Sequence, residues 1–247
     1  MNRKEKQENS IELTLIIPCY NEAQIIEKSL PRLEYFLEMV KISYEIIIID
    51  DCSKDATVRL IQDMIKDMSK NITFIQHSQN KGRGYTVREG ISLAKGKYVG
   101  FIDIDLEIPE YYILPALMKL REDADVVIGK RLYTVAFSFS SLLRWITSRG
   151  YSFLMRNALK IPFSDTEAGF KFFNRERILP IVKQTENNHW FWDTEIVALS
   201  YYKDLRIDDL PVVFTRNLYK TSTVKIFRDT VIYVQEIIKF KKRIKNL

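Results

Sequence analysis

Residues 44–55 read Tyr-Glu-Ile-Ile-Ile-Ile-Asp-Asp-Cys-Ser-Lys-Asp, an apolar run that stops at two acids. The run has the length of a strand, and the polar cluster after it is typical of a turn. We therefore predict a strand at 44–49 that ends in Asp50 and Asp51. The rest of the chain repeats this pattern, because apolar runs of strand length alternate with amphipathic stretches of helix length.

That alternation predicts βαβ units in a mostly parallel sheet flanked by helices, which is an α/β fold. Beyond Gly129 the order is less regular, and residues 138–160 form a long amphipathic stretch in which aromatic side chains alternate with arginines. The predicted strands are 12–17, 44–49, 72–76, 98–102, 125–128, 169–173 and 205–214. The predicted helices are about 22–40, 55–68, 82–94, 109–121, 193–202 and 224–245.

Composition restricts the class of protein. The chain has 247 residues, of which 46% are hydrophobic and 28% charged, with a formal charge of +6. These values exclude a disordered chain or a coiled-coil rod. They favour one domain at 11–247, after a polar, disordered tail at 1–10 and ending in a basic amphipathic helix at 224–247. Two cysteines are too few for a disulfide scaffold, and together with the absence of an export signal they predict a cytoplasmic protein.

The sequence also bears on whether the chain spans a membrane or binds nucleic acid. No apolar window approaches the ~18 residues that a membrane-spanning helix needs. The positive charge is mild and no nucleic-acid-binding motif accompanies it, so we expect no nucleic acid partner.

The histidines, His77 and His189, lack companions for a metal site. Gly82-Arg-Gly84 is predicted to be a turn that opens a helix, with a possible donor contact.

Acidic residues follow several of the predicted strands. In parallel α/β sheets ligands bind beyond the carboxyl ends of the strands, so these residues are candidates for a site. One such cluster, Asp50, Asp51 and Ser53, is explained equally well by helix capping and turn formation. Carboxylates that meet at one edge repel each other unless a cation compensates them. The acids after three strands therefore favour a divalent metal and a substrate that carries phosphate.

The segment Asp103-Ile-Asp105-Leu-Glu107 is the strongest metal candidate. If it is extended, alternate side chains point to the same side, and its three carboxylates make a hard oxygen ligand set. Such a set suits Mg²⁺ or Mn²⁺. We predict Asp103, Asp105 and Glu107 as metal ligands.

Four strings of the sequence belong together: Ile-Pro-Cys-Tyr-Asn-Glu at 17–22, Ile-Asp-Asp-Cys-Ser-Lys-Asp at 49–55, Asp-Ile-Asp at 103–105 and Asp-Thr-Glu-Ala-Gly-Phe at 165–170. In this order and spacing they resemble the family-2 inverting glycosyltransferases with the GT-A fold. Within that family they are similar to the dolichyl-phosphate mannose and glucose synthases. The resemblance implies transfer of a hexose, mannose or glucose, from GDP-mannose or UDP-glucose to a polyprenyl phosphate such as dolichyl phosphate. It also implies a mostly parallel sheet with C-terminal amphipathic helices.

The resemblance also assigns roles to individual residues. Asp105, Asp165 and Arg131 match catalytic positions, and Glu107 stands where many relatives carry Gln. The loop at 217–223 departs from the family, since it lacks a lysine that relatives have. Donor-nucleotide positions are matched by Pro18, Tyr20, Glu22, Asp51 and Asp103, and acceptor-phosphate positions by Arg131, Arg144 and Ser148.

Chemistry agrees with a phosphate acceptor. A phosphate monoester has a second pKa near ~6, so at neutral pH it is already a nucleophile and needs arginine more than a base. Asp165 either stabilises charge on the sugar or positions the acceptor, and the sequence leaves both open. A lipid acceptor requires contact with a membrane surface, either by peripheral binding at the cytosolic face or through an anchoring subunit. The alternatives are a glycan or other non-lipid acceptor, or a non-catalytic nucleotide-sugar sensor.

Overall fold

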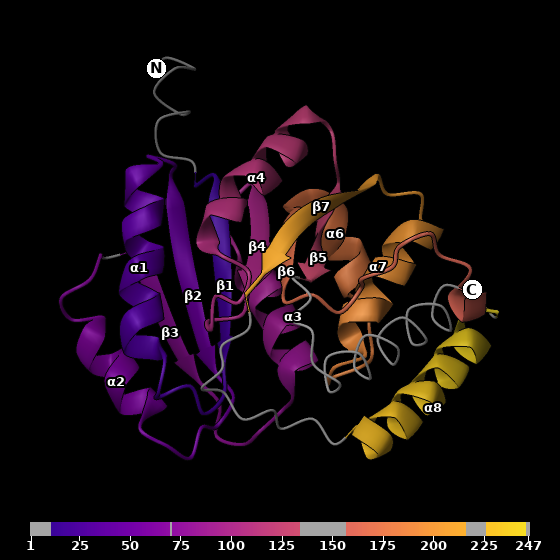
Figure 1. Cartoon of the computed structure of the whole chain (residues 1–247), viewed down its shortest axis with the longest axis horizontal. Coiled ribbons are helices and arrows are strands. Elements are labelled where there is room, and N and C mark those ends of the chain that lie inside the picture. The colour runs from indigo at the N-terminus through magenta and orange to yellow at the C-terminus, as the bar shows by residue number, and fades with distance from the viewer. Residues whose placement is uncertain (1–10, 70, 134–156, 216–225, 246–247) are drawn as a thin grey trace.

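The computed structural model describes residues 11–69, 71–133, 157–215 and 226–245. Its strands form a seven-stranded sheet in the order β3-β2-β1-β4-β6-β5-β7 (Figure 1). The strands are β1 (Leu13–Cys19), β2 (Tyr44–Asp50), β3 (Ile72–Gln76), β4 (Tyr98–Ile102), β5 (Val126–Tyr133), β6 (Phe170–Asn174) and β7 (Ile207–Phe214). The helices are α1 (Ile26–Met39), α2 (Thr57–Met64), α3 (Arg83–Leu93), the 3-10 helix η1 (Glu110–Tyr112), α4 (Ile113–Glu122), α6 (Arg175–Val182), α7 (Trp192–Tyr202) and α8 (Ile226–Ile244).

Strand β6 runs against its neighbours. It pairs antiparallel with both β4 and β5, whereas the other strand pairs are parallel. Ile102, the last residue of β4, therefore lies opposite Phe170, the first residue of β6. The residues that precede β6 thus reach the same edge of the sheet as the carboxyl ends of β1, β2 and β4.

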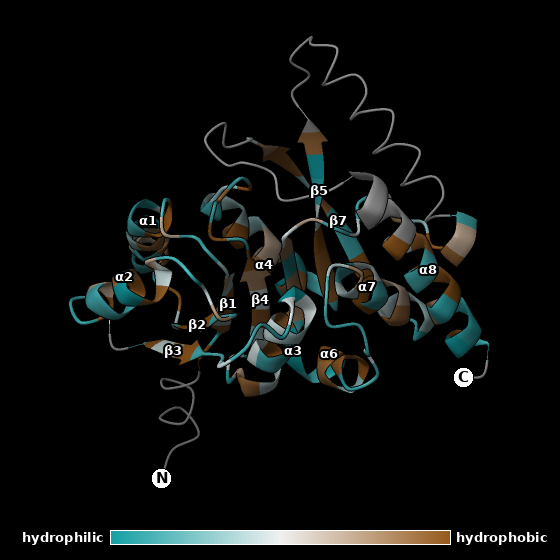
Figure 2. Ribbon diagram, turned by 90° about the horizontal axis from the view of Figure 1, so that it is seen from below, coloured by the Kyte–Doolittle hydropathy of each residue, from teal (hydrophilic) through white to brown (hydrophobic). Residues whose placement is uncertain are grey.

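Helices cover both faces of the sheet. Leu13, Leu15 and Ile17 of β1 point to the face that packs on α1 and α4, whereas Ile16 points to the face that packs on α3, α6 and α7. Gly90 lets α3 lie close to the sheet, because a Cβ atom there would be 2.7 Å from a side-chain carbon of Ile16. In Figure 2 the strands are largely brown, while the helices carry both colours.

Helix α8 has one buried and one exposed side. Tyr233, Ile237 and Phe240 are buried against the core of the domain. The opposite side exposes two isoleucines together with basic residues: Ile232, Ile238, Lys239, Lys241 and Lys242. The prediction of a basic amphipathic helix at the C-terminal end is therefore confirmed for the described residues. Among those residues, no helix combines the length and the apolar character needed to cross a bilayer.

Several predicted boundaries were wrong. Strand β5 continues to Tyr133 instead of ending at 128, because its second half pairs with β7 after β6 has ended. Helix α2 ends at Met64, and α6 was not predicted at all. Helix α6 has only eight residues and contains Pro180, so its periodic signal is weak. The tail at 1–10 and most of the stretch at 138–160 lie outside the described residues.

Candidate active site

Four parts of the chain meet at the carboxyl edge of the sheet. Strands β1, β2 and β4 bring the residues that follow them to this edge, and the reversed β6 brings residues 165–169. Asp103 marks the contact, because its backbone N–H donates to the carbonyl oxygen of Gly169 at 3.0 Å. Two sequence strings that are about sixty residues apart are thus joined at one site.

The loop after β1 is fixed by the loop after β2. Asn21 has a left-handed backbone (φ 57°), and its N–H donates to the Ser53 hydroxyl at 2.8 Å. The Asn21 side-chain oxygen accepts in return from the N–H of Lys54 at 2.7 Å. The N–H of Glu22 donates to the Thr57 hydroxyl at 2.8 Å. With the loop held by these hydrogen bonds, Tyr20 is 47% exposed at the edge of the sheet. The same hydrogen bonds explain why α1 begins at Ile26, later than predicted.

The two acids at the end of β2 play different structural parts. Asp50 is fully buried, and its carboxylate accepts the N–H of Ser53 at 2.9 Å, as the turn interpretation predicts. Asp51 is also buried, but its carboxylate accepts the backbone N–H groups of Lys81 and Gly82 at 2.7 and 2.8 Å. Asp51 therefore holds the loop before α3 as well as lying in the predicted donor site.

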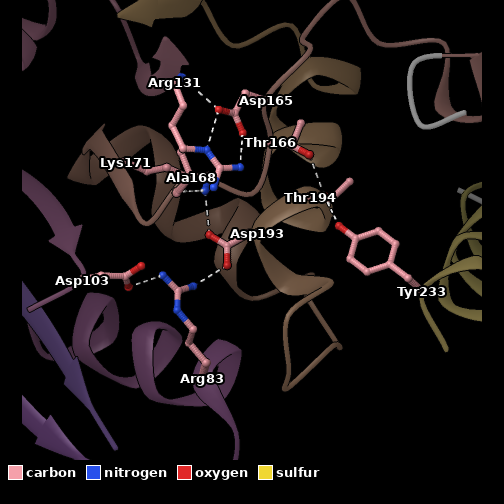
Figure 3. A network of polar contacts seen from close by, with 10 residues as sticks. All are labelled: Arg83, Asp103, Arg131, Asp165, Thr166, Ala168, Lys171, Asp193, Thr194 and Tyr233. Carbon is pink, nitrogen blue, oxygen red and sulfur yellow. Dashed lines mark hydrogen bonds and ion pairs between the residues drawn. The ribbon is translucent and has the colours of Figure 1, made fainter. Parts of the chain in front are cut away.

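Arg83 connects two acids across the site (Figure 3). One nitrogen of its guanidinium donates to Asp103 at 2.7 Å and another pairs with Asp193. The central carbon of the guanidinium lies over the rings of Phe101 and Trp190, at 5.2 and 5.4 Å from the ring centroids. Burial by itself lowers the pKa of Arg83, but the charges of Asp103 and Asp193 outweigh it and raise the pKa. Arg83 is thus a fixed cation beside the predicted metal acid.

Arg83 belongs to the predicted helix-opening turn, and the turn is confirmed because α3 begins there. The ion pairs of Arg83 were missed, since no local pattern marks partners that lie 20 and 110 residues away.

A buried ion pair lies beneath this cation. Lys171 is fully buried in β6, and its ammonium donates to Asp193 at 2.6 Å and to the carbonyl oxygen of Ala168 at 2.7 Å. Burial lowers the pKa of Lys171, and the neighbouring Asp193 carboxylate opposes that shift. This pair is absent from the sequence predictions, although a lysine inside the apolar string Phe-Lys-Phe-Phe at 170–173 is a signal for it. Asp193 therefore links Lys171 of β6 to Arg83 of α3, and Arg83 in turn pairs with Asp103 (Figure 3).

The segment 103–107 is a turn rather than an extended strand, so that expectation was wrong. The N–H of Leu106 donates to the carbonyl oxygen of Asp103 at 3.1 Å, and Leu106 has a left-handed backbone (φ 50°). The alternation in burial nevertheless holds, because Ile104 and Leu106 are buried while Asp103, Asp105 and Glu107 are half-buried. Within the described residues, no group of three or more His, Cys, Asp or Glu side chains is arranged to hold a metal ion. The carboxylates of Asp103, Asp105 and Glu107 therefore do not form a complete metal site by themselves.

Arg131 and Asp165 form the second half of the site. The Asp165 carboxylate accepts the Arg131 backbone N–H at 2.9 Å and two guanidinium nitrogens at 2.9 and 2.7 Å. Both side chains are largely buried, and Arg131 also lies 5.6 Å from the Phe214 ring. Burial raises the pKa of Asp165, but the hydrogen bonds and charge of Arg131 outweigh this and leave the pKa lowered. Asp165 is thus an ionised residue that fixes the direction of Arg131 and is poorly suited to take up a proton.

The lowered pKa of Asp165 predicts a pH-dependent contribution to stability. The unfolded value is about 3.8 and the folded value is lower, so the contribution is complete above the unfolded value and is lost as pH falls through the folded one. We expect wild type to exceed Asp165→Asn in unfolding free energy at pH 5 and the difference to shrink below about pH 3.8. Urea unfolding between pH 2.5 and 6 measures this difference. Asp63→Asn is the control, since Asp63 also has a lowered pKa but lies in an exposed pair. An equal effect of Asp63→Asn would contradict the attribution of this stability difference to the buried Asp165 carboxylate.

Residues close in sequence to Asp165 and Asp193 are connected to α8 by hydrogen bonds and ion pairs. The hydroxyls of Thr166 and Thr194 share a hydrogen bond at 2.7 Å, and Thr194 also bonds the hydroxyl of Tyr233 (Figure 3). Arg243 pairs with Glu186 at 2.8 Å and with the buried Glu195. Helix α8 therefore contacts Thr194, the neighbour of Asp193, directly, and it reaches Thr166, the neighbour of Asp165, through Thr194.

Some predicted site residues are placed at this edge and others are not described. Arg144, Ser148 and the loop at 217–223 lie outside the described residues. The structure brings together the acidic and basic residues of the prediction, and it leaves their roles as predictions. The predicted residues that the sheet edge gathers are Pro18, Tyr20, Glu22, Asp51, Asp103, Asp105, Glu107, Arg131 and Asp165.

Comparison with known proteins gives consistent matches. The family model "Glycosyl transferase family 2" matches residues 14–178. The dolichyl-phosphate beta-glucosyltransferase of Dictyostelium discoideum is 31% identical over 248 residues, which cover 95% of this chain and 75% of that protein. The protein of the same name in Saccharomyces cerevisiae is 28% identical over 258 residues, covering 94% of this chain and 77% of that protein.

Solved structures share the fold. Glucosyl-3-phosphoglycerate synthase from Mycobacterium tuberculosis, crystallised with Mn²⁺, UDP and glucosyl-3-phosphoglycerate, superposes with a TM-score of 0.67 at 16% identity. The match covers 96% of this chain and 80% of that chain. Staphylococcus aureus TarS 1–349 in complex with UDP-GlcNAc has a TM-score of 0.60 at 17% identity, covering 93% of this chain and 66% of that chain. The predicted α/β fold of the GT-A type is therefore confirmed.

Proposed function

The chain belongs to glycosyl transferase family 2, and from that premise we propose that it transfers glucose from UDP-glucose to dolichyl phosphate with inversion at the sugar. The observation that carries the proposal is the meeting of Asp103 and the Arg131–Asp165 pair at one sheet edge. Asp103 suits the donor diphosphate, and the Arg131–Asp165 pair suits an acceptor phosphate. Glucose is preferred to mannose, and UDP to GDP, because relatives that match almost the whole chain are named as glucosyltransferases.

The donor end suits a divalent cation. Mg²⁺ and Mn²⁺ prefer carboxylate oxygens, and Mg²⁺ is commonly held by one or two carboxylates while substrate phosphates and water complete its coordination. The half-buried Asp103 and Asp105 supply such oxygens, and the absence of a third preformed ligand in the described residues fits a site completed by the donor. Asp103 and Asp105 would hold the ion, with Glu107 beside them. When bound, the ion supplies charge neutralisation to the leaving UDP.

The acceptor end suits a phosphate dianion. At neutral pH the phosphate of dolichyl phosphate is a nucleophile without a general base. The ionised Asp165 fixes Arg131, whose planar guanidinium can hold a phosphate in one direction and reduce its repulsion from the donor diphosphate. The phosphate oxygen then attacks the sugar carbon opposite the departing UDP oxygen, and the configuration at that carbon inverts. Of the two roles considered for Asp165, its three hydrogen bonds to Arg131 favour positioning.

Alanine in place of Arg131 is expected to weaken acceptor use more than donor binding. Losing a charged hydrogen-bond partner costs about 1.5–3 kcal/mol, so the KM for dolichyl phosphate should rise about ten- to a hundredfold. The Kd for UDP should stay within about twofold of wild type, because a change of that size is well under 1 kcal/mol. Steady-state kinetics and calorimetry measure the two quantities. Arg177→Ala, which removes an exposed ion pair with Asp125, is the control. A loss confined to UDP binding would place Arg131 at the donor end.

Helix α8 fits peripheral binding at the cytosolic face of a membrane. Its exposed side combines Ile232 and Ile238 with Lys239, Lys241 and Lys242. A basic residue near an anionic leaflet contributes about 1 kcal/mol, and the apolar side chains can enter the interface. An anchoring subunit could serve the same purpose. Binding of the protein to vesicles with and without anionic lipid tests this part of the proposal.

Transfer of radiolabelled sugar to an organic-extractable lipid tests the function directly. Purified protein, dolichyl phosphate and Mg²⁺ or Mn²⁺ are combined with UDP-glucose in one tube and GDP-mannose in another. Label in the organic phase from UDP-glucose alone, abolished by EDTA and restored by the metal, is the expected result. Label from GDP-mannose alone would change the sugar and the donor. UDP binding without any lipid product would change the acceptor or leave a nucleotide-sugar sensor.

A further inference from the structure

We infer that His77 is a positioning residue for the donor nucleotide: as an imidazolium held between Asp51 and Glu89, it fixes the loop that joins Asp51 to Arg83. The inference rests on the proposed function, because it assigns the donor nucleotide to the edge where Asp51 lies. It concerns a residue that the predicted catalytic, donor and metal sets did not include.

His77 is a buried histidine with an acid on each side. It follows β3 directly, and its side chain is 2% exposed. Its Nδ1 atom lies 2.8 Å from an oxygen of Asp51, at the end of β2. Its Nε2 atom lies 2.5 Å from an oxygen of Glu89, on α3. Tyr85, also on α3, contacts the ring edge to face. Asp51, Glu89 and Tyr85 are the titratable groups that these contacts place around the ring.

The two contacts together require an extra proton. A neutral imidazole has one N–H donor and one lone pair, so it can donate to only one of two ionised carboxylates. The lone pair would then face the oxygen of the other acid at hydrogen-bonding distance. An imidazolium donates to both, and hydrogen bonds between charged groups are the stronger kind. The geometry therefore fits His77 in its charged form.

The charge of His77 acts on the donor side through Asp51. The same carboxylate accepts the N–H groups of Lys81 and Gly82, which immediately precede α3. Gly82 has φ +94°, a conformation that L side chains rarely adopt, so this loop is held in an unusual shape. The next residue is Arg83, which pairs with Asp103. A chain of contacts thus runs from His77 through Asp51 and the loop to the predicted metal acid.

A neutral His77 could no longer donate hydrogen bonds to both Asp51 and Glu89. A neutral His77 would turn a lone pair toward Asp51 or toward Glu89, and in the first case the carboxylate would lose a donor. Asp51 would then hold the Lys81–Gly82 loop less firmly, and the donor site would be less well ordered before the nucleotide arrives. Ordering that has to occur on binding weakens the affinity. We therefore expect UDP affinity to depend on the charge of His77.

Nitrogen NMR of wild-type protein tests the charge state without any ligand. The chain has two histidines, so His189→Gln identifies which signals belong to His77. At pH 7 we expect both ring nitrogens of His77 to show the shifts of protonated nitrogen. A shift typical of an unprotonated nitrogen at either position would overturn the inference. Because this measurement uses the wild-type chain, a variant that fails to fold cannot obscure it.

Calorimetry with UDP and the metal tests the consequence. Glu89→Gln removes one of the two anions, and we expect the Kd for UDP at pH 7 to rise about tenfold, the lower end of what a charged hydrogen bond is worth. His77→Gln, which replaces the imidazolium by an uncharged amide, should also raise the Kd for UDP at pH 7.

Glu12→Gln is the matched control for this experiment. The side chains of Glu12 and Glu89 are 27% and 28% exposed, and each pairs with one cationic group or ring. Glu12 lies before β1, at the opposite edge of the sheet, so its substitution should leave the Kd unchanged. If UDP binds wild type and Glu89→Gln equally at pH 7, the inference is overturned while the proposed function stands. If UDP does not bind wild type at all, the proposed function is overturned.

Discussion

Alanine in place of Gly169 is expected to reduce sugar transfer by about a hundredfold or more, because it displaces Asp103. A Cβ atom at this position would lie 1.8 Å from one carboxylate oxygen of Asp103 and 2.2 Å from its carboxyl carbon. Asp103 has little freedom to move away, since its N–H is bonded to Gly169 and its other oxygen to Arg83. A displacement of about 1 Å in a group that positions substrate can cost about a hundredfold in rate.

Comparison with Gly100→Ala separates this effect from general overpacking. A Cβ atom at Gly100 would lie 2.3 Å from the ring of Phe172, in the core and away from the sheet edge. That substitution should lower the free energy of unfolding by about 1–3 kcal/mol and leave the turnover of the folded enzyme near wild type. Urea unfolding and kcat at a temperature where both variants are folded measure the contrast. Wild-type turnover by Gly169→Ala would show that Asp103 is not needed where it stands.

Methionine in place of Lys171 is expected to lower the free energy of unfolding by about 3 kcal/mol, the lower end of what breaking a buried ion pair costs. Lys171 is fully buried, and its ammonium is 2.6 Å from the equally buried Asp193. Without it, Asp193 keeps only Arg83 among the cations that pair with it in the described residues, and the carbonyl oxygen of Ala168 loses its side-chain donor. Methionine fills similar space, so the loss is mainly electrostatic.

Lys119→Met provides the matched exposed case. Lys119 pairs with Asp208 at 3.1 Å, but both side chains are about a quarter to a third exposed. Solvent screens such a pair, and its removal should cost about 0–1 kcal/mol. Chemical denaturation of the three proteins at pH 7 gives both differences. Equal effects of the two substitutions would mean that the buried pair contributes no more than a surface one.

Sequence patterns predicted most of the parallel half of the fold. The isoleucine run at 46–49 and the acids after it predicted both β2 and the edge where the site lies. The four motif strings also predicted the family and the GT-A type of fold, and both predictions are confirmed. These features are predictable because each depends on residues adjacent in the chain, where periodicity and turn chemistry act directly.

Contacts between distant residues were not predictable in the same way. The reversal of β6 has no signature in residues 169–173, although it decides that Gly169 touches Asp103. Arg83 finds its acids 20 and 110 residues away, and His77 finds Asp51 and Glu89 on two other elements. The extended form expected for 103–107 is replaced by a turn, in which Leu106 has a left-handed backbone and its N–H donates to the carbonyl oxygen of Asp103. Such outcomes depend on tertiary packing, which no short window records.

The position of β6 also has a consequence for folding as the chain is made. Residues 170–174 supply the strand between β4 and β5, so a chain synthesised only as far as Tyr133 has two strands whose facing edges lack their partner. Unpaired edges invite pairing with other chains. Inserting a strand that comes from about 40 residues beyond β5 also makes contacts of long sequence separation, which slow folding. We therefore expect truncation before β6 to give an aggregating chain, and the active site to be among the last parts to form.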